Sequence, residues 1–161
     1  MDLGGGSTDA ALLDENGKVT STHLAGAGEF ITMMIDSELG INNISLAEDI
    51  KRYNLAKVES LFHMRLENGE ILFFDEPLEP KLFGRVVVCR EGEFIPIESS
   101  HSMEKIVEIR RNVKKEVFVN NAVRALKKIA PLREIRNIPN VVMVGGSALD
   151  FEIPEMISDE L

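Results

Sequence analysis

Residues 2–9 read Asp2-Leu3-Gly4-Gly5-Gly6-Ser7-Thr8-Asp9, three consecutive glycines between two acidic residues. Glycine admits backbone conformations closed to other residues, so such a run can bring its N–H groups close to an anion. Ser7 and Thr8 add hydroxyl donors. We therefore predict that Gly4 to Thr8 wrap the outer phosphates of a nucleotide, while Asp2 and Asp9 hold the hydrated Mg²⁺ that accompanies them. The alternative is a glycine-rich hairpin turn in which the aspartates are only caps.

A second glycine turn lies near the other end of the chain, where Val141-Val142-Met143-Val144 runs into Gly145-Gly146-Ser147. The apolar run predicts a buried strand. The glycines after it would let the backbone pass flat against a ring or a ribose, with Ser147 available to hydrogen-bond. We predict that the turn contacts the nucleoside part of the same ligand, through Gly145, Gly146, Ser147 and Ala148.

Two common phosphate-binding motifs are absent. No lysine follows the first glycines as a P-loop requires, and the stretch Gly26-Ala27-Gly28-Glu29-Phe30-Ile31 lacks the third glycine of a dinucleotide fingerprint. Neither of those folds is expected.

Length and composition favour one ordinary globular domain, since 44% of the 161 residues are hydrophobic and 28% are charged. No apolar run approaches the roughly 20 residues of a membrane helix, and Met1 leads straight into Asp2 rather than into a signal sequence. We expect a cytoplasmic protein without a membrane partner. The net charge of −9 disfavours nucleic acid, which needs clustered Lys and Arg.

Cysteine and histidine give no sign of a metal or disulfide framework. Cys89 is the single cysteine, so no intrachain disulfide is possible. The histidines His23, His63 and His101 stand too far apart for a local metal-ligand motif. A structural zinc site is therefore not expected.

Periodicity predicts an α/β domain with a mixed sheet. A hairpin is expected from Ala10–Leu13 and Val19–Leu24, then a helix over Gly28–Leu39 ended by Gly40. Ser45, with Glu48 three residues later, matches a capping box and predicts a second helix to about His63. The remaining elements are strands at 70–74, 85–89 and 93–97 and one long helix over 102–130, stopped by Pro131.

The long helix carries most of the chain's clustered basic residues: Arg110, Arg111, Lys114, Lys115, Arg124, Lys127 and Lys128. Charged residues at helical spacing are usually a solvated face, and we expect one here.

Three elements, in this order, resemble the ATPase superfamily of actin, sugar kinases and heat-shock chaperones. DLGGGSTD resembles its second phosphate motif, and VVMVGGSALDFEIP resembles its adenosine motif. Between them, Glu48-Asp49-Ile50-Lys51-Arg52 matches the acidic-x-x-Lys-Arg pattern with which the chaperones hold ribose and adenine. The resemblance implies an actin-like, ribonuclease H-like lobe that binds ATP or ADP with Mg²⁺, with Glu48 and Lys51 at the nucleoside. The alternatives are a capping role for Glu48 and a solvated face for Lys51 and Arg52.

Four longer stretches resemble the large subunit of glycerol or diol dehydratase reactivases. They are THLAGAGEF, SLAEDIKRYNLAKVESLFHMRLENG, EKIVEIRRNVKKEVFVNNAVRALKKIAP and IRNIPNVVMVGGSALDFEIP. Members of that family are chaperone-like. With a small partner subunit they release damaged cobalamin from an adenosylcobalamin-dependent dehydratase, and exchange of ADP for ATP drives the cycle. The resemblance does not distinguish glycerol from propane-1,2-diol as the dehydratase substrate.

The resemblance covers only the second lobe of the superfamily. We expect residues 1–161 to form this lobe as one domain, with a β-rich insert at about 68–98 and no first lobe. A catalytic cleft needs two walls, so the isolated piece should bind nucleotide weakly and hydrolyse it negligibly. Two other functions stay open: a lobe of a sugar-kinase-like phosphotransferase, or a non-enzymatic interaction module using the β-rich segment or the basic helix as its contact surface.

Overall fold

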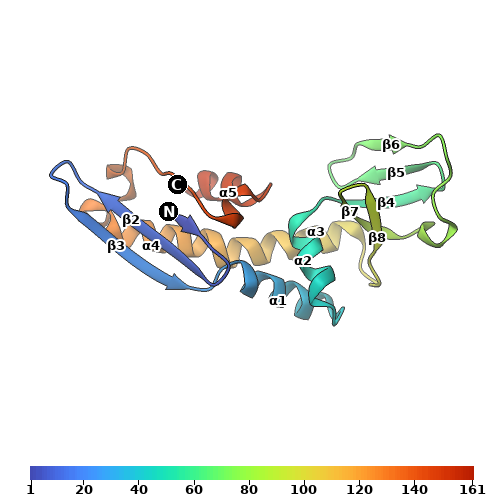
Figure 1. Ribbon diagram of the computed structural model, residues 1–161, viewed down its shortest axis with the longest axis horizontal. Helices are drawn as coiled ribbons and strands as arrows, with labels where there is room; N and C mark the ends of the chain where they lie inside the picture. Colours follow the sequence, from blue (N-terminus) through green and yellow to red (C-terminus); the bar gives the residue numbers. More distant parts are fainter. The chain divides into compact units, whose positions relative to one another are not determined.

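The computed structural model describes residues 1–161, which divide into two compact units. Unit 1 comprises Met1–Ile31 and Arg111–Leu161, and unit 2 comprises Thr32–Arg110. Two helices, α1 (Gly28–Leu39) and α3 (Met103–Lys114), contain the boundaries between these units. Figure 1 shows the elements of each unit along the chain.

The sheet of unit 1 is built around the predicted hairpin. Its strands are β1 (Asp2–Leu3), β2 (Ser7–Leu13) and β3 (Val19–Ala25), all antiparallel and in the order β1-β2-β3. The prediction of a hairpin that begins with the glycine run is confirmed. The run itself, Gly4–Gly6, is the connection between β1 and β2.

The predicted buried strand at Val141–Val144 is wrong. This segment is not a strand but lies along β1, where Leu3 N–H donates to Val144 O (2.8 Å), Val144 N–H donates to Met1 O (2.8 Å) and one parallel bridge joins Asp2 to Val144. Val142 is 70% exposed and Val144 is 50% exposed. The two-residue β1 offers too short an edge for a ladder. We expected a mixed sheet, but both sheets of the structure are antiparallel. The bridge between Asp2 and Val144 is the one parallel pairing.

One continuous helical stretch follows the predicted long helix. It consists of α3, a π-helical segment over Lys115–Val119 and α4 (Asn120–Ile129), and it ends before Pro131 as predicted. α4 packs on the sheet of unit 1 through a cluster formed by Ala10, Leu24, Ala125, Leu126 and Ile129. Two 3₁₀ turns follow, Pro131–Arg133 and Ile135–Asn137, and then Gly146–Leu149 and the last helix, α5 (Ile153–Glu160).

Two of the basic residues expected on a solvated face are completely buried. Arg110 and Lys114 are both 0% exposed. In unit 2, Arg110 donates to Glu67 Oε1 (2.7 Å) and Oε2 (3.2 Å). In unit 1, Lys114 Nζ lies 2.9 Å from an Asp150 carboxylate oxygen and 2.7 Å from Glu152 Oε2. The prediction is wrong for this pair because carboxylates distant in sequence supply buried partners.

The two helices α1 and α2 compare differently with their predictions. α1 ends at Leu39 as predicted, and Gly40 has the expected left-handed backbone (φ 62°). The second helix, α2, spans Ile44–Arg52 and is capped by Asn43, whose side chain accepts the N–H of Leu46 (3.1 Å). The predicted Ser45 cap and the predicted end near His63 are therefore wrong. Asn43 takes the cap position, and Leu55–Ser60, in which Leu55, Ala56 and Val58 are buried, form a strand and do not continue the helix.

Unit 2 contains a five-stranded antiparallel sheet of order β6-β5-β4-β7-β8. The strands are β4 (Leu55–Ser60), β5 (His63–Leu66), β6 (Ile71–Phe73), β7 (Val86–Arg90) and β8 (Glu93–Pro96), with a 3₁₀ turn at Pro80–Leu82. Its core cluster comprises Ala56, Val58, Met64, Leu82 and Val87. The three strands predicted in this region are confirmed, and two more precede them.

Candidate nucleotide site

The glycine run of unit 1 is fixed by its carbonyl groups. Gly26 N–H donates to Gly6 O (3.2 Å), Gly28 N–H to Gly4 O (3.2 Å) and Glu29 N–H to Gly5 O (2.9 Å). The N–H groups of Gly5 and Gly6 donate to no protein acceptor, and both residues are exposed. The loop therefore keeps its carbonyl oxygens turned towards the protein and leaves two consecutive N–H groups for an acceptor from solution, the polarity that an anion requires.

The second glycine turn lies beside this loop. A Cβ atom at Gly28, the first residue of α1, would lie 3.3 Å from Ser147 Oγ and 3.6 Å from Gly4 O. The structure thus brings together the predicted phosphate loop and the predicted nucleoside turn, which the sequence separates by about 140 residues. Ser147 and Ala148 belong to the 3₁₀ turn Gly146–Leu149 that follows Gly145.

Gly145 is required by packing against β1. Its backbone (φ 94°, ψ 165°) is one that only glycine adopts readily, and a Cβ atom there would overlap Asp2 Oδ1 and lie 2.7 Å from Leu3 O. Gly146 has no such neighbour, because a Cβ atom there would meet nothing within 4 Å. The two adjacent glycines therefore differ: the first lets the turn approach β1, and the second is open to solvent.

Asp2 and Asp9 are directly opposite each other across β1 and β2, and His23 lies opposite Asp9 on β3. Ser7 Oγ donates to Asp9 Oδ2 (2.7 Å), and His23 Nδ1 lies 2.5 Å from Asp9 Oδ1. These hydrogen bonds, the one from Ser7 first, hold the pKa of Asp9 below its usual value. We call Asp2, Asp9 and His23 the carboxylate row. All three line a surface hollow of about 600 Å³, whose other lining residues are Met1, Ala10, Ala11, Ser21, Thr22 and Val144.

The carboxylate pair fits a hydrated Mg²⁺. No group of three or more His, Cys, Asp or Glu side chains is arranged to hold a metal directly. Magnesium, however, usually keeps several of its waters and takes only one or two carboxylates from the protein, together with substrate phosphates. Asp2 and Asp9 supply that number of carboxylates at the end of the glycine loop. Sequence reasoning missed His23 because its link to Asp9 depends on strand register.

Thr8 occupies a different position from Ser7. It is completely buried, and its hydroxyl lies 3.5 Å from Gly26 O. Neighbouring strand residues point to opposite faces, so the Thr8 hydroxyl is on the face opposite Ser7 and Asp9. Ser7, and not Thr8, therefore supplies the hydroxyl group that contacts the carboxylate row.

Glu48 and Lys51 form a tight cluster with Thr32 in unit 2. Lys51 Nζ donates to Thr32 Oγ1 (2.8 Å) and to Glu48 Oε2 (2.5 Å), and the Thr32 hydroxyl donates to Glu48 Oε2 (2.5 Å). Burial raises the pKa of Glu48, but the hydrogen bonds from Lys51 and Thr32 outweigh it, so the net shift is downward. Neither alternative from the sequence holds for these two residues, because Glu48 is not a cap and Lys51 is only 9% exposed. Arg52 is exposed.

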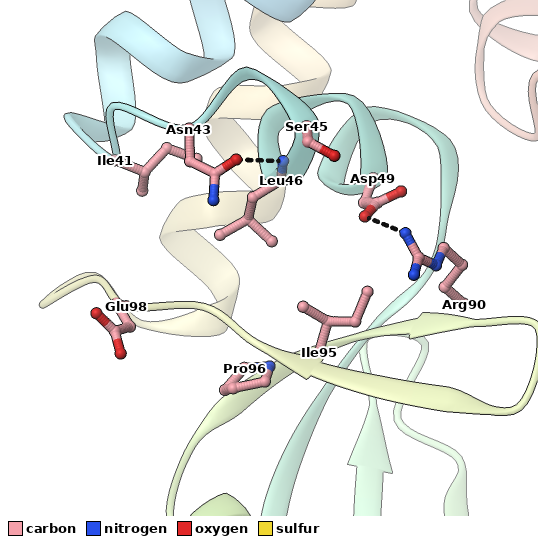
Figure 2. Close-up of a pocket in the computed structure, with 9 residues that line it drawn as sticks. All are labelled: Ile41, Asn43, Ser45, Leu46, Asp49, Arg90, Ile95, Pro96 and Glu98. Carbon is pink, nitrogen blue, oxygen red and sulfur yellow. Dashed lines mark hydrogen bonds and ion pairs between the residues drawn. The ribbon is translucent and has the colours of Figure 1, made fainter.

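Unit 2 also contains a hollow that the sequence did not indicate. It has a volume of about 450 Å³. Figure 2 shows its lining residues between the start of α2 and strand β8. Arg90 pairs with Asp49 (3.0 Å) at one side of it, and Leu46, Ile95 and Pro96 are its apolar lining residues. None of the residues predicted for the nucleotide site lines this hollow.

Comparison with known proteins places the chain in a family. The sequence profile of the family described as "Diol dehydratase reactivase ATPase-like domain" matches residues 1–161. The chain belongs to this reactivase family. Among curated relatives, the propanediol dehydratase-reactivating factor large subunit of Citrobacter freundii is 52% identical over 161 residues, which are 100% of this chain and 26% of that protein.

Solved structures agree with this membership. A glycerol dehydratase reactivase superposes with a TM-score of 0.93 at 52% identity, covering 98% of this chain and 26% of that one. A diol dehydratase-reactivating factor in nucleotide-free form superposes with a TM-score of 0.95 at 52% identity, covering 99% of this chain and 26% of that one. The chain thus spans about a quarter of the length of these reactivases. None of its helices is both long and apolar enough to cross a bilayer.

Proposed function

We propose that this chain is the nucleotide-binding lobe of an ATP-dependent dehydratase reactivase. The observation that carries the proposal is the glycine loop of unit 1, whose carbonyl groups are tied back while the N–H groups of Gly5 and Gly6 are exposed and unpaired. It lies beside the Asp2–Asp9 pair and the Gly145 turn. Membership in a family of reactivase ATPase-like domains supports the same function.

In this proposal each group has a chemical task. The N–H groups of Gly5 and Gly6 donate to the outer phosphates, and the Ser7 hydroxyl orients Asp9. Asp2 and Asp9 accept hydrogen bonds from waters around Mg²⁺, which neutralises phosphate charge when bound. Gly146, Ser147 and Ala148 lie against the nucleoside.

The Glu48–Lys51 cluster is the proposed nucleoside contact of unit 2. Its internal hydrogen bonds hold the carboxylate and the ammonium in fixed positions before any ligand arrives, which lowers the entropic cost of binding. The pair suits a ribose, because the carboxylate accepts from hydroxyl groups and the ammonium donates to them.

We also propose that the two units together form one actin-like lobe, in which the β-rich part of unit 2 is an insertion. The observed five-stranded sheet, from Leu55 to Pro96, is larger than the predicted insert at 68–98. The lobe would supply one wall of an ATP cleft, and the other wall would come from another lobe.

The relatives' names suggest the wider context. They describe a large subunit and a factor that reactivates a diol or propanediol dehydratase. We propose that this chain works with a small subunit in the cytoplasm. The assembly would release damaged cobalamin from an adenosylcobalamin-dependent glycerol or diol dehydratase, with exchange of ADP for ATP driving the release.

The test uses the complete large subunit that carries this chain. It should restore an inactivated dehydratase only when ATP and Mg²⁺ are present, and Asp2→Ala should abolish Mg²⁺-dependent ATP hydrolysis. Asp75→Ala is the matched control, because Asp75 is exposed in unit 2 and lies outside the predicted site. Unchanged hydrolysis in Asp2→Ala would refute the site. Phosphorylation of an added polyol would favour the sugar-kinase alternative, and partner binding unaffected by nucleotide would favour a simple interaction module.

A further inference from the structure

The basic residues of the long helix differ in their partners. Arg110 and Lys114 are buried in ion pairs, and the exposed Lys105, Arg111 and Lys115 also pair with acidic side chains. From Arg124 onwards, the basic side chains are exposed and none of them forms an ion pair within the chain. We call this exposed set the basic face, and its members are Arg124, Lys127 and Lys128 of α4, and Arg133 and Arg136 of the two turns that follow.

The basic face is exceptional in an acidic protein. The whole chain has a net charge of −9, yet residues 117–149 contain these five basic residues and a single acidic one, Glu134. Lys127 and Lys128 lie in the last turn of α4, where the helix dipole favours cations. The dipole acts only over that turn, so it does not account for Arg124, Arg133 or Arg136.

The basic face points away from the core of unit 1. Residues 124, 127 and 128 share one side of α4, because they are spaced by three and four positions. The opposite side carries Ala125, Leu126 and Ile129, which pack against the sheet. Ile135 and Ile138 pack against the same cluster, so the turns that carry Arg133 and Arg136 are anchored beside the end of α4.

An exposed leucine sits among these cations on a strained backbone. Leu132 is 91% exposed and has φ 55°, and Arg133 follows with φ 59°. The left-handed region is unfavourable for residues with a Cβ atom. Arg133 N–H donates to Ala130 O (3.0 Å), and the Asn137 side chain donates to Pro131 O (3.1 Å), which holds the turn in this form. Because the Leu132 side chain is almost fully exposed, its burial within unit 1 cannot offset the backbone strain.

We propose that the basic face and Leu132 form a docking surface for the client dehydratase, which would present a carboxylate-rich surface with an apolar recess for the leucine. The proposal rests on the proposed function. A cationic surface with one apolar anchor suits a transient encounter, since charge complementarity accelerates association, whereas permanent subunit interfaces are larger and more apolar. A dehydratase that must arrive for reactivation and leave afterwards fits these properties.

The first test neutralises the helical part of the basic face in the complete large subunit. The variant Arg124→Gln/Lys127→Gln/Lys128→Gln is compared with Lys18→Gln/Lys81→Gln/Lys105→Gln, which removes the same charge from exposed sites elsewhere. Association with purified, inactivated dehydratase is followed by surface plasmon resonance at low and high salt. We expect the basic-face variant to associate about tenfold more slowly at low salt, with a smaller difference at high salt, and the control to resemble the wild type.

The second test is Leu132→Gly. Glycine accepts the left-handed backbone, so the thermal midpoint should stay equal or rise while the affinity for the dehydratase falls by about tenfold. A structural role would instead lower stability and binding together. Unchanged association in both variants would overturn the proposal, as would equal loss in the charge control.

Further outcomes distinguish a wrong partner from a wrong function. If binding of a DNA duplex or of the small subunit requires the basic face while binding of the dehydratase does not, the dehydratase is not the partner of this surface. A wild-type subunit that hydrolyses ATP but fails to bind the dehydratase overturns the docking surface alone. One that does neither overturns the proposed function as well.

Discussion

Gly145→Ala should destabilise this chain far more than Gly146→Ala, although the two glycines are adjacent. At Gly145 the backbone (φ 94°, ψ 165°) lies in a region almost restricted to glycine, and the added methyl group would overlap Asp2 Oδ1 and approach Leu3 O to 2.7 Å. At Gly146 the methyl group would meet nothing within 4 Å.

The size of the effect follows from two contributions. Holding alanine in this backbone region costs about 1–3 kcal/mol. Overlap with the backbone of β1 adds about 1–3 kcal/mol, because a strand cannot move aside as a flexible side chain can. The sum for Gly145→Ala is about 2–6 kcal/mol, whereas Gly146→Ala should stay within about 0.5 kcal/mol of the wild type.

Urea denaturation followed by circular dichroism measures both variants. With a slope of about 2 kcal/mol per molar urea, the midpoint of Gly145→Ala should fall by about 1–3 M, and that of Gly146→Ala should hardly change. Equal shifts in the two variants would refute the reasoning, since they would mean that the close approach of the turn to β1 does not decide the need for glycine. The sequence alone would have assigned both glycines to the ligand.

Three further outcomes test other contacts. Lys114→Met should cost about 3–5 kcal/mol in unfolding free energy, because it removes the buried ammonium that pairs with the carboxylates of Asp150 and Glu152, while Lys115→Met, at an exposed ion pair, should cost less than about 1 kcal/mol. Ser7→Ala should raise the lowered pKa of Asp9 towards its usual value, which an NMR titration of the Asp9 carboxyl carbon would measure. The ionised Asp9 contributes to stability at pH values above its usual pKa, and this contribution is lost as the pH falls through the lowered pKa. Burial raises the pKa of Cys89 to about 11, so iodoacetamide at pH 8 should alkylate it roughly a hundredfold more slowly than a free thiol, and a rate like that of free cysteine would contradict the burial.

Elements with strong local signals could be predicted from the sequence. The α1 helix has regular apolar spacing and ends at a left-handed glycine, and the hairpin of β2 and β3 has an Asn-Gly turn, so each was found. The end of α2 was misplaced because residues such as Val58 fit a helical period and a strand period equally well over a short stretch. The cap was misplaced because Asn43 and Ser45 are both good caps and only one can occupy the position.

Contacts between residues far apart in the sequence are the part of the candidate site that could not be predicted. The sequence indicated both glycine turns, but their meeting at Gly28, the link from His23 to Asp9 and the pairing of Glu48 with Thr32 depend on which strands and helices pack together. The buried ion pair of Arg110 with Glu67 spans 43 positions and leaves no periodic trace. Helical spacing alone therefore could not tell the buried cations of the long helix from the exposed ones.

The π-helical segment at Lys115–Val119 fixes the length of the chain between α3 and α4. A π-helical turn holds one residue more than an α-helical turn, so removing one residue from this segment would leave an α-helical turn and keep the phase of α4. Ala125 and Leu126 would then stay packed against the sheet. An α-helix turns by about 100° per residue, so the same deletion within α4 would rotate the residues after it by about that angle. In an alignment of the family, a single-residue gap should therefore be tolerated better at Lys115–Val119 than within α4.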